Sequence, residues 1–214
     1  MDDKETRTVY NLPNILTLSR IVVIPIIFLS VYTNSLLVST LVAILFAAAS
    51  ITDYFDGYLA RTHNQTTIFG RLLDPIADKL LVFSALFVIL VKDMVALPIS
   101  YIPIIIILCR EVLVSGLREF LAEVRVGMPV TRLAQWKTGF QMFAIGGLLF
   151  RDSIFVFGVL GEILLWIAGV LTFITGYQYF QKSIDYVKKV ENGKKNPAPK
   201  KVPGKVPAKK KKKK

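Results

Sequence analysis

Four aspartates stand at regular spacing in two neighbouring apolar segments of the 214-residue chain. Asp53 and Asp56 are three residues apart and Asp74 and Asp78 are four apart, so each pair occupies one face of a helix. Four carboxylates in one low-dielectric place repel one another and cannot all ionise without a cation. Because neither pair includes a histidine or cysteine, these oxygen ligands favour Mg²⁺ or Mn²⁺ over zinc. Magnesium keeps coordination positions open for phosphate oxygens, so the spacing predicts a phosphorylated substrate as well as a metal.

Small and basic residues accompany the aspartates at fixed positions. Gly57 and Ala60 lie beside the carboxylate face, where a larger side chain would block the approach of a ligand. Arg61 offers a bidentate donor for phosphate, and Gly70 allows a close bend before the next helix. Acids at helix ends are often only solvated caps. Four aspartates in this register with these small and basic residues favour catalysis over that alternative.

The elements that position these residues are membrane helices. Hydrophobic residues make up 53% of the chain and come in long blocks, which is typical of a protein whose solvent is lipid. Each block is long enough to cross about 30 Å of hydrocarbon, and no strand is expected. Pro75 is expected in the first turn of its helix, and the single cysteine, Cys109, is expected to be buried. The chain is thus predicted to be an all-α integral membrane protein with six transmembrane helices, at residues 15–32, 36–59, 72–91, 95–118, 133–150 and 153–180.

The charges of the connections predict the orientation. The connections after the first, third and fifth segments have no net charge, whereas the other connections are basic. The basic side of a membrane protein is the cytoplasmic one, so both termini and the four aspartates are expected there, in the plasma membrane. The basic residues of this set are Arg61, Arg71, Arg125, Arg132 and Lys137, followed by the lysines of the C-terminal tail.

The formal net charge of +12 belongs mainly to the tail. Residues 192–214 contain eleven lysines and no acid, so the rest of the chain is nearly neutral and the charge does not indicate a nucleic-acid-binding protein. We expect a catalytic membrane domain at residues 1–185 and a disordered Lys/Pro-rich cytoplasmic tail at residues 186–214. The tail is either a solubilising extension or a segment that adheres to anionic lipid.

The full pattern resembles the signature of the CDP-alcohol phosphotransferase family. It reads Asp53-x₂-Asp56-Gly57-x₂-Ala60-Arg61-x₈-Gly70-x₃-Asp74-x₃-Asp78, and all eight signature positions match. The resemblance covers about residues 10–185 and implies the six-helix fold of that family. It also implies a reaction in which an alcohol attacks a CDP-linked lipid and displaces CMP.

The resemblance implies a role for each signature residue. Asp53, Asp56, Asp74 and Asp78 would hold Mg²⁺ or Mn²⁺, with two ions expected, and Asp78 would also be the base that accepts the proton of the alcohol. Two metal ions can clamp the attacking and leaving oxygens of such a transfer, which agrees with the chemistry inferred from the aspartates alone. The residues implied to contact the CDP group are Gly57, Ala60, Arg61 and Gly70, together with Asn14 and Thr17 of the first segment.

The acceptor alcohol is indicated by other segments. Residues 11–20, 109–119 and 136–142 are similar to members of the family that use glycerol 3-phosphate. Arg110 and Arg118 are eight residues apart on one helix face, and with Lys137 they could form a cationic pocket for a dianionic acceptor. Alternatively, these cations only pair with nearby glutamates, namely Glu111, Glu119 and Glu123. Arg20 either faces the lipid headgroup or extends to the membrane interface.

Several alternatives stay open from the sequence. The same family includes enzymes whose acceptor is phosphatidylglycerol, serine, inositol or inositol phosphate. A divalent-cation transporter would also place acids inside a membrane, but it predicts polar residues at the midplane and internal repeats. The expected substrates are therefore CDP-diacylglycerol and glycerol 3-phosphate, and family resemblance suggests a homodimer.

Overall fold

The computed structural model describes residues 12–63, 68–124 and 132–191, and within these ranges it leaves undescribed the side chains of residues 12, 13, 54–63, 68, 69, 71, 132, 189 and 191. No strand occurs in these ranges, which confirms the all-helical prediction. Short 3₁₀ helices, η1 (Ser30–Tyr32) and η2 (Pro98–Ser100), join some of the α-helices. The α-helices are α2 (Leu12–Leu29), α3 (Leu36–His63), α4 (Ile68–Val91), α5 (Tyr101–Glu123), α6 (Arg132–Leu149) and α7 (Phe155–Glu191).

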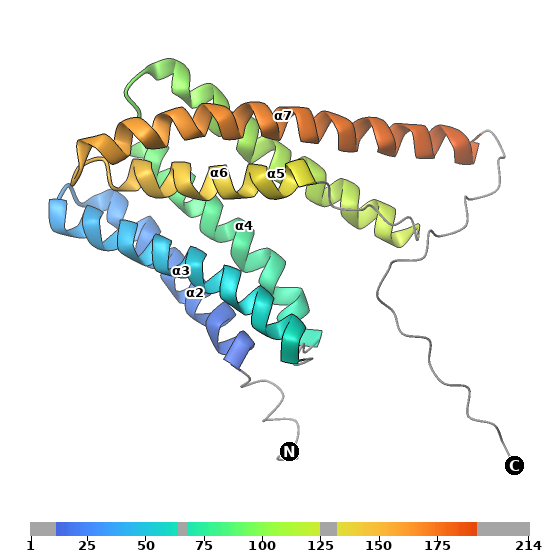
Figure 1. Ribbon diagram of the computed structural model, residues 1–214, viewed down its shortest axis with the longest axis horizontal. Coiled ribbons are helices and arrows are strands. Elements are labelled where there is room, and N and C mark those ends of the chain that lie inside the picture. The colour runs from blue at the N-terminus through green and yellow to red at the C-terminus, as the bar shows by residue number, and fades with distance from the viewer. Residues whose placement is uncertain (1–11, 64–67, 125–131, 192–214) are drawn as a thin grey trace, which may run out of the picture.

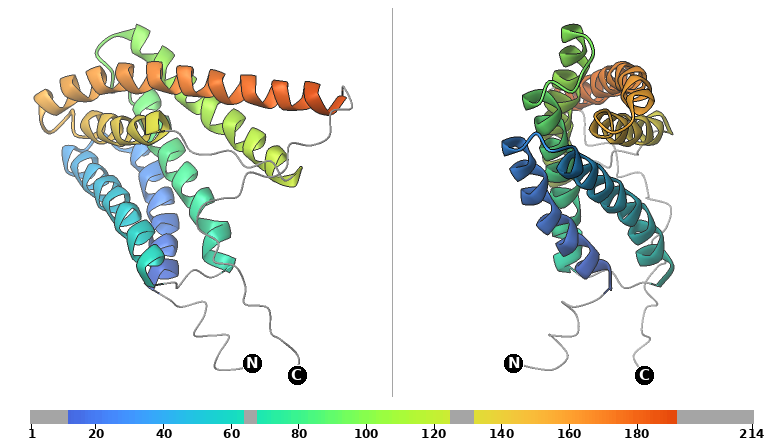
Figure 2. Two further views of the ribbon diagram at one scale, coloured as in Figure 1. Left: turned by 45° about the vertical axis from the view of Figure 1, so that its right-hand side comes forward. Right: turned by 90° about the vertical axis from the view of Figure 1, so that its left-hand side faces the viewer.

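Helices α2, α3 and α4 run alongside one another in the lower part of Figure 1. The start of α2, the end of α3 and the start of α4 lie at the same end of this group in all three views (Figures 1 and 2). Helix α2 packs against both α4 and α3, whereas α3 and α4 contact each other much less. The two helices that hold the aspartates are therefore brought together mainly through α2.

Helices α6 and α7 pack closely along each other and cross above the first group (Figure 1). Two glycines allow this close approach. A Cβ atom on Gly161 would lie 2.7 Å from the backbone N of Leu148, and one on Gly147 would lie 2.7 Å from the carbonyl O of Phe157. Small residues of this kind let membrane helices approach until their backbones touch. Helix α5 also packs against α7.

A buried carboxylate in α7 fixes the connection between α4 and α5. Glu162 accepts hydrogen bonds from the backbone N–H groups of Ala96 at 2.8 Å and Leu97 at 3.2 Å, and from the hydroxyl of Ser100. These donors satisfy the acid, so its burial has a structural explanation. Glu162 is thus an anchor for the start of α5.

One hydrophobic core joins all the long helices. Central α4 contributes most to it, because its residues at helical spacing face inward on several sides. The most deeply buried members include Ile27, Phe46, Leu81, Leu86, Ile89, Ile107, Ile145, Leu148 and Leu165.

The outer surface is strongly apolar, as expected of a membrane protein. Within the part of the chain that the structure describes, four helical stretches are long and apolar enough to cross a membrane, namely Asn14–Tyr32, Leu36–Asp53, Pro98–Glu123 and Phe155–Lys188. Helix α4 does not qualify because it contains Asp74, Asp78 and Lys79, and the first half of α6 is polar. The described helices therefore support four spans, and six spans remain a prediction.

Some sequence-based boundaries were wrong. Helix α4 begins at Ile68, so Pro75 lies inside the helix and not in its first turn. Helix α7 continues past the predicted domain boundary at residue 185 to Glu191. Cys109 is exposed on α5 and not buried, because its side of the helix faces away from the core.

Candidate active site

One face of α2 is polar within an otherwise apolar helix. Asn14, Thr17 and Arg20 follow at intervals of three residues and therefore lie on the same side of the helix. All three side chains are buried, and Arg20 is only 1% exposed. A buried arginine needs compensating partners, so this face has to meet carboxylates from another element.

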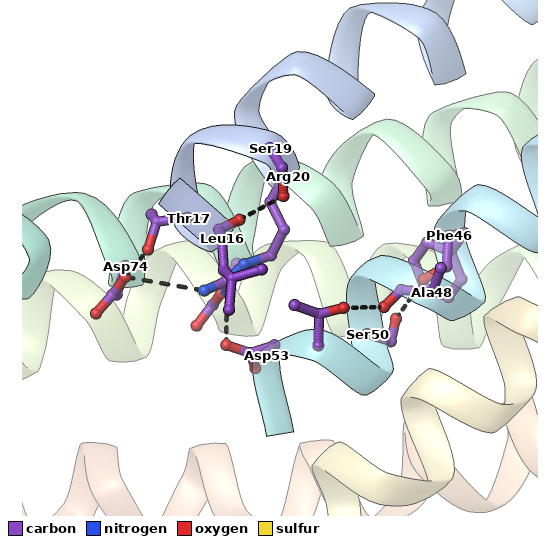
Figure 3. Close-up of polar contacts among 11 residues, drawn as sticks. Leu16, Thr17, Ser19, Arg20, Phe46, Ala48, Ser50, Asp53 and Asp74 are labelled. Atoms are coloured by element: carbon purple, nitrogen blue, oxygen red, sulfur yellow. Dashed lines mark hydrogen bonds and ion pairs between the residues drawn. The ribbon is translucent and has the colours of Figure 1, made fainter. Parts of the chain in front are cut away.

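Those partners are three of the predicted aspartates. The Nη1 atom of Arg20 lies 2.6 Å from Oδ1 of Asp53 in α3 and also donates to the carboxylate of Asp78 in α4. Its Nη2 atom lies 3.8 Å from Oδ1 of Asp74. Figure 3 shows Arg20 extending from α2 toward Asp53 and Asp74. The structure thus brings these three aspartates together around one guanidinium.

Thr17 completes this arrangement, because its hydroxyl donates a hydrogen bond to Oδ1 of Asp74 (Figure 3). The three aspartate side chains are partly open, with exposed fractions of 35% to 46%. Arg20 behind them is closed off. We call Thr17, Arg20, Asp53, Asp74 and Asp78 the aspartate cluster. Its carboxylates can be reached by a ligand, whereas its arginine cannot.

The composition of the aspartate cluster fits a hard divalent cation. All its possible ligands are oxygens, and Arg20 neutralises only one of three negative charges, which leaves an excess that a divalent ion would balance. Among the described residues, no three acidic, histidine or cysteine side chains are already arranged as a metal site. The cation that the three aspartates share in this arrangement is Arg20.

Four predicted residues lie in the last turns of α3, where only the backbone is described. They are Asp56, Gly57, Ala60 and Arg61. Helix α3 is unbroken from Leu36 to His63, so Asp56 follows Asp53 by about one turn on the same helix face. Gly70 is buried in the first turn of α4. Their predicted contacts with CDP remain predictions.

A second group of charged residues joins α5, α6 and α7. Lys137 of α6 is 3% exposed and donates to Oε1 of Glu111 in α5. Arg110 Nη1 lies 3.2 Å from the same oxygen. The alternative in which nearby glutamates pair with these cations is therefore realised for Arg110 and Lys137, both at Glu111.

Arg118 is held differently. Its Nη2 atom lies 3.2 Å from the hydroxyl of Tyr179 in α7, and its Cζ atom lies 5.3 Å from the centre of that ring. The guanidinium of Arg110 lies 5.9 Å from the same ring centre. We call Arg110, Glu111, Arg118, Lys137 and Tyr179 the cationic cluster. It contains all three residues predicted to bind the acceptor phosphate.

Two members of these clusters lie where the sequence does not predict them. The sequence places Arg20 only at the lipid headgroup or the membrane interface, although an arginine within an apolar segment signals a buried partner. Tyr179 carries no sequence signal, because a tyrosine is ordinary in an apolar helix. Its position against Arg118 follows only from the packing of α5 on α7.

Comparisons with known proteins identify the family of the chain. Residues 10–174 match the family described as CDP-alcohol phosphatidyltransferase. The chain is similar to proteins named CDP-diacylglycerol–glycerol-3-phosphate 3-phosphatidyltransferase from several bacteria. The protein of Rickettsia felis is 52% identical over 179 residues, which cover 82% of this chain and 97% of the relative. That of Haemophilus influenzae is 41% identical, covering 80% and 92%, and that of Cereibacter sphaeroides is 38% identical, covering 84% and 98%.

Proposed function

The chain belongs to the CDP-alcohol phosphatidyltransferase family, and from that membership we propose that it transfers a phosphatidyl group from CDP-diacylglycerol to glycerol 3-phosphate. The products are phosphatidylglycerophosphate and CMP, which makes the chain a transferase of phospholipid biosynthesis. The relatives named for this reaction match it over nearly their whole length, so the proposal concerns the whole membrane domain.

The observation that carries the proposal is the convergence of Asp53, Asp74 and Asp78 on one point. These residues come from two helices and are part of the family signature. Members of this family generally depend on a divalent metal, and the oxygen ligands of the aspartate cluster fit such an ion. We assign Asp53, Asp56, Asp74 and Asp78 to two Mg²⁺ or Mn²⁺ ions, which when bound would neutralise the diphosphate of the lipid.

In the proposed reaction a hydroxyl of glycerol 3-phosphate attacks the phosphorus that is attached to diacylglycerol. A new phosphorus–oxygen bond to glycerol forms, the bond to the CMP oxygen breaks, and CMP leaves with that oxygen. Asp78 accepts the proton of the attacking hydroxyl. Arg20 keeps the carboxylate of Asp78 in place through its hydrogen bond, because a misplaced base slows such a transfer.

The CDP group is assigned to the ends of α2, α3 and α4 that meet beside the aspartates. Asn14 and Thr17 on α2, with Gly57, Ala60, Arg61 and Gly70, would line it. The hydrogen bond from Thr17 to Asp74 supports this assignment for α2, because it puts the polar face of that helix at the aspartate cluster.

The acceptor phosphate is assigned to Arg110, Arg118 and Lys137. These three cations outnumber the single carboxylate of their cluster, Glu111, so a dianionic phosphate would balance their charge. A neutral acceptor such as serine or inositol would leave this excess uncompensated. The cationic cluster therefore favours glycerol 3-phosphate over the neutral acceptors of the family.

The membrane setting follows from the apolar surface and the family. We propose that the protein spans the plasma membrane, with both termini and the aspartate cluster on the cytoplasmic side, where CMP is released. We also propose that it acts as a homodimer, as the family resemblance suggests.

The decisive experiment is a CMP-release assay with purified protein in detergent and CDP-diacylglycerol. The acceptors compared are glycerol 3-phosphate, serine, inositol, inositol phosphate and phosphatidylglycerol, each with Mg²⁺, with Mn²⁺ and with a chelator. We expect CMP release only with glycerol 3-phosphate and only when a divalent ion is present. Release with another acceptor would reassign the alcohol, and metal flux into vesicles without CMP release would favour the transporter.

A further inference from the structure

The cationic cluster contains one uncharged residue, the tyrosine at position 179. Tyr179 of α7 is 3% exposed and contacts both arginines of α5 through its ring. Its hydroxyl also lies 3.2 Å from Nη2 of Arg118. One side chain thus contacts two of the three cations assigned to the acceptor phosphate.

Two arginines at this spacing do not come together on their own. Arg110 and Arg118 are about 12 Å apart along the axis of α5, since a helix rises 1.5 Å per residue, and their guanidiniums repel each other. Each guanidinium lies within 6 Å of the Tyr179 ring centre, the distance at which the negative face of an aromatic ring attracts a cation. The ring therefore attracts both guanidiniums and offsets their mutual repulsion.

Helix α7 also provides the space for this arrangement. Gly176 lies one turn before Tyr179, on the same face of the helix. A Cβ atom at Gly176 would lie 3.0 Å from Cγ of Arg110, so the stem of the arginine rests against the bare backbone. Gly176, which has no side chain, and the ring of Tyr179 together form the surface of α7 against which Arg110 packs.

The partners of the cations differ in a way that matters for binding. Lys137 and Arg110 both pair with Glu111. Arg118 forms no ion pair with any carboxylate in the part of the chain that the structure describes, and Tyr179 is neutral. Arg118 is therefore fixed in position while its charge stays uncompensated, which is the state that a phosphate-binding arginine requires.

We propose that Tyr179 is a positioning residue for the acceptor, and this rests on the function proposed above. Its hydroxyl holds Arg118 and its ring holds Arg110 beside it, so that both guanidiniums face the phosphate of glycerol 3-phosphate. Tyr179 sets the affinity for the acceptor and has no part in binding the lipid donor.

The test measures kcat and KM separately for glycerol 3-phosphate and for CDP-diacylglycerol in Tyr179→Phe and Tyr179→Leu. The matched control is Tyr177→Phe on the same helix, since Tyr177 is exposed and its hydroxyl contacts only Gln181 at 2.7 Å among the described side chains. Loss of the hydroxyl should raise the KM for glycerol 3-phosphate about fivefold. Loss of the ring in Tyr179→Leu should raise the KM for glycerol 3-phosphate about 30-fold, because both arginines lose their contact with the ring. The KM for CDP-diacylglycerol should stay unchanged in both variants.

Inorganic phosphate provides a second readout, because it should compete with glycerol 3-phosphate at the arginines. Its inhibition constant should rise in parallel with the acceptor KM in the Tyr179 variants and not in Tyr177→Phe. If Tyr179→Leu does not fold, Tyr179→Phe alone decides. The proposal is overturned if Tyr179→Phe behaves like the control, or if the KM values for both substrates rise together as in a general loss of structure. Absence of wild-type turnover with glycerol 3-phosphate would instead overturn the proposed function, and the inference with it.

Discussion

The molecule contains two charge clusters that are opposite in composition. In the aspartate cluster, three carboxylates from α3 and α4 surround one arginine from α2. In the cationic cluster, two of the three cations from α5 and α6 pair with one glutamate, and the third rests on a tyrosine. Each cluster keeps an excess of one sign, negative at the aspartate cluster and positive at the cationic cluster. These signs suit the roles proposed above, namely divalent metal ions at the aspartates and the acceptor phosphate at the cations.

The clusters also differ in how open they are. The aspartate side chains are 35% to 46% exposed, while Arg20 beneath them is buried. Lys137 and Arg110 are nearly closed off, at 3% and 11%. An open carboxylate site suits ions and a large nucleotide that enter and leave. Arg118 is exposed, so a small anion can reach the cationic cluster from that side and meet the buried Lys137 and Arg110, whose charges are costly without a matching partner.

The largest effect on kcat is expected at Asp78, the proposed general base in the aspartate cluster. Asp78→Asn should lower kcat about 1000-fold, since it removes the proton acceptor of the attacking hydroxyl. The KM for CDP-diacylglycerol should change little. Asp93→Asn is the matched control, because Asp93 lies in the connection after α4 and contacts Tyr101. CMP release measures both. Near-normal turnover in Asp78→Asn would remove Asp78 as the base.

Substitution of the buried arginine tests whether the aspartate cluster depends on Arg20. Arg20→Ala should lower kcat about 100-fold, because the three carboxylates lose the donor that holds them in place. Arg151→Ala, in the turn after α6, controls for the loss of an arginine elsewhere. Activity and thermal unfolding are measured together. A fully active, stable Arg20→Ala protein would show that the metal alone organises the aspartates.

A substitution in the cationic cluster should change the KM for the acceptor and leave the KM for the lipid donor unchanged. Arg118→Ala should raise the KM for glycerol 3-phosphate about 50-fold, the typical value of a hydrogen bond to a charged group. The KM for CDP-diacylglycerol should stay the same, and Lys182→Ala, an exposed lysine of α7, should have no effect. An unchanged KM for glycerol 3-phosphate in Arg118→Ala would contradict the assignment of the cationic cluster to the acceptor phosphate.

The smallest effect is expected from the C-terminal tail. Removing residues 192–214 takes away eleven lysines but none of the residues assigned to either cluster. The kcat in detergent should therefore equal that of the full chain, and an activity difference should arise only in vesicles of anionic lipid, where lysines attract the surface. A large loss of kcat in detergent would show that the two clusters do not suffice for turnover.

The sequence by itself determined the chemistry and its family. The spacing of Asp53, Asp56, Asp74 and Asp78 indicated oxygen ligands for metal, and long apolar blocks indicated helices in lipid. These conclusions are local, because helical periodicity and residue type decide them within a few turns. Helix ends were less well predicted, as Pro75 inside α4 and the extension of α7 to Glu191 show.

The tertiary structure decided which residues complete each cluster. Arg20 lies 33 residues before Asp53, yet it meets Asp53, Asp74 and Asp78 because α2 packs against both α3 and α4. Tyr179 lies 61 residues after Arg118 and meets it because α5 packs on α7. Such pairs depend on which helix faces contact one another, and no spacing along the chain encodes that. Three of the four predicted aspartates, Asp53, Asp74 and Asp78, are thus held together by an arginine that only the fold brings to them.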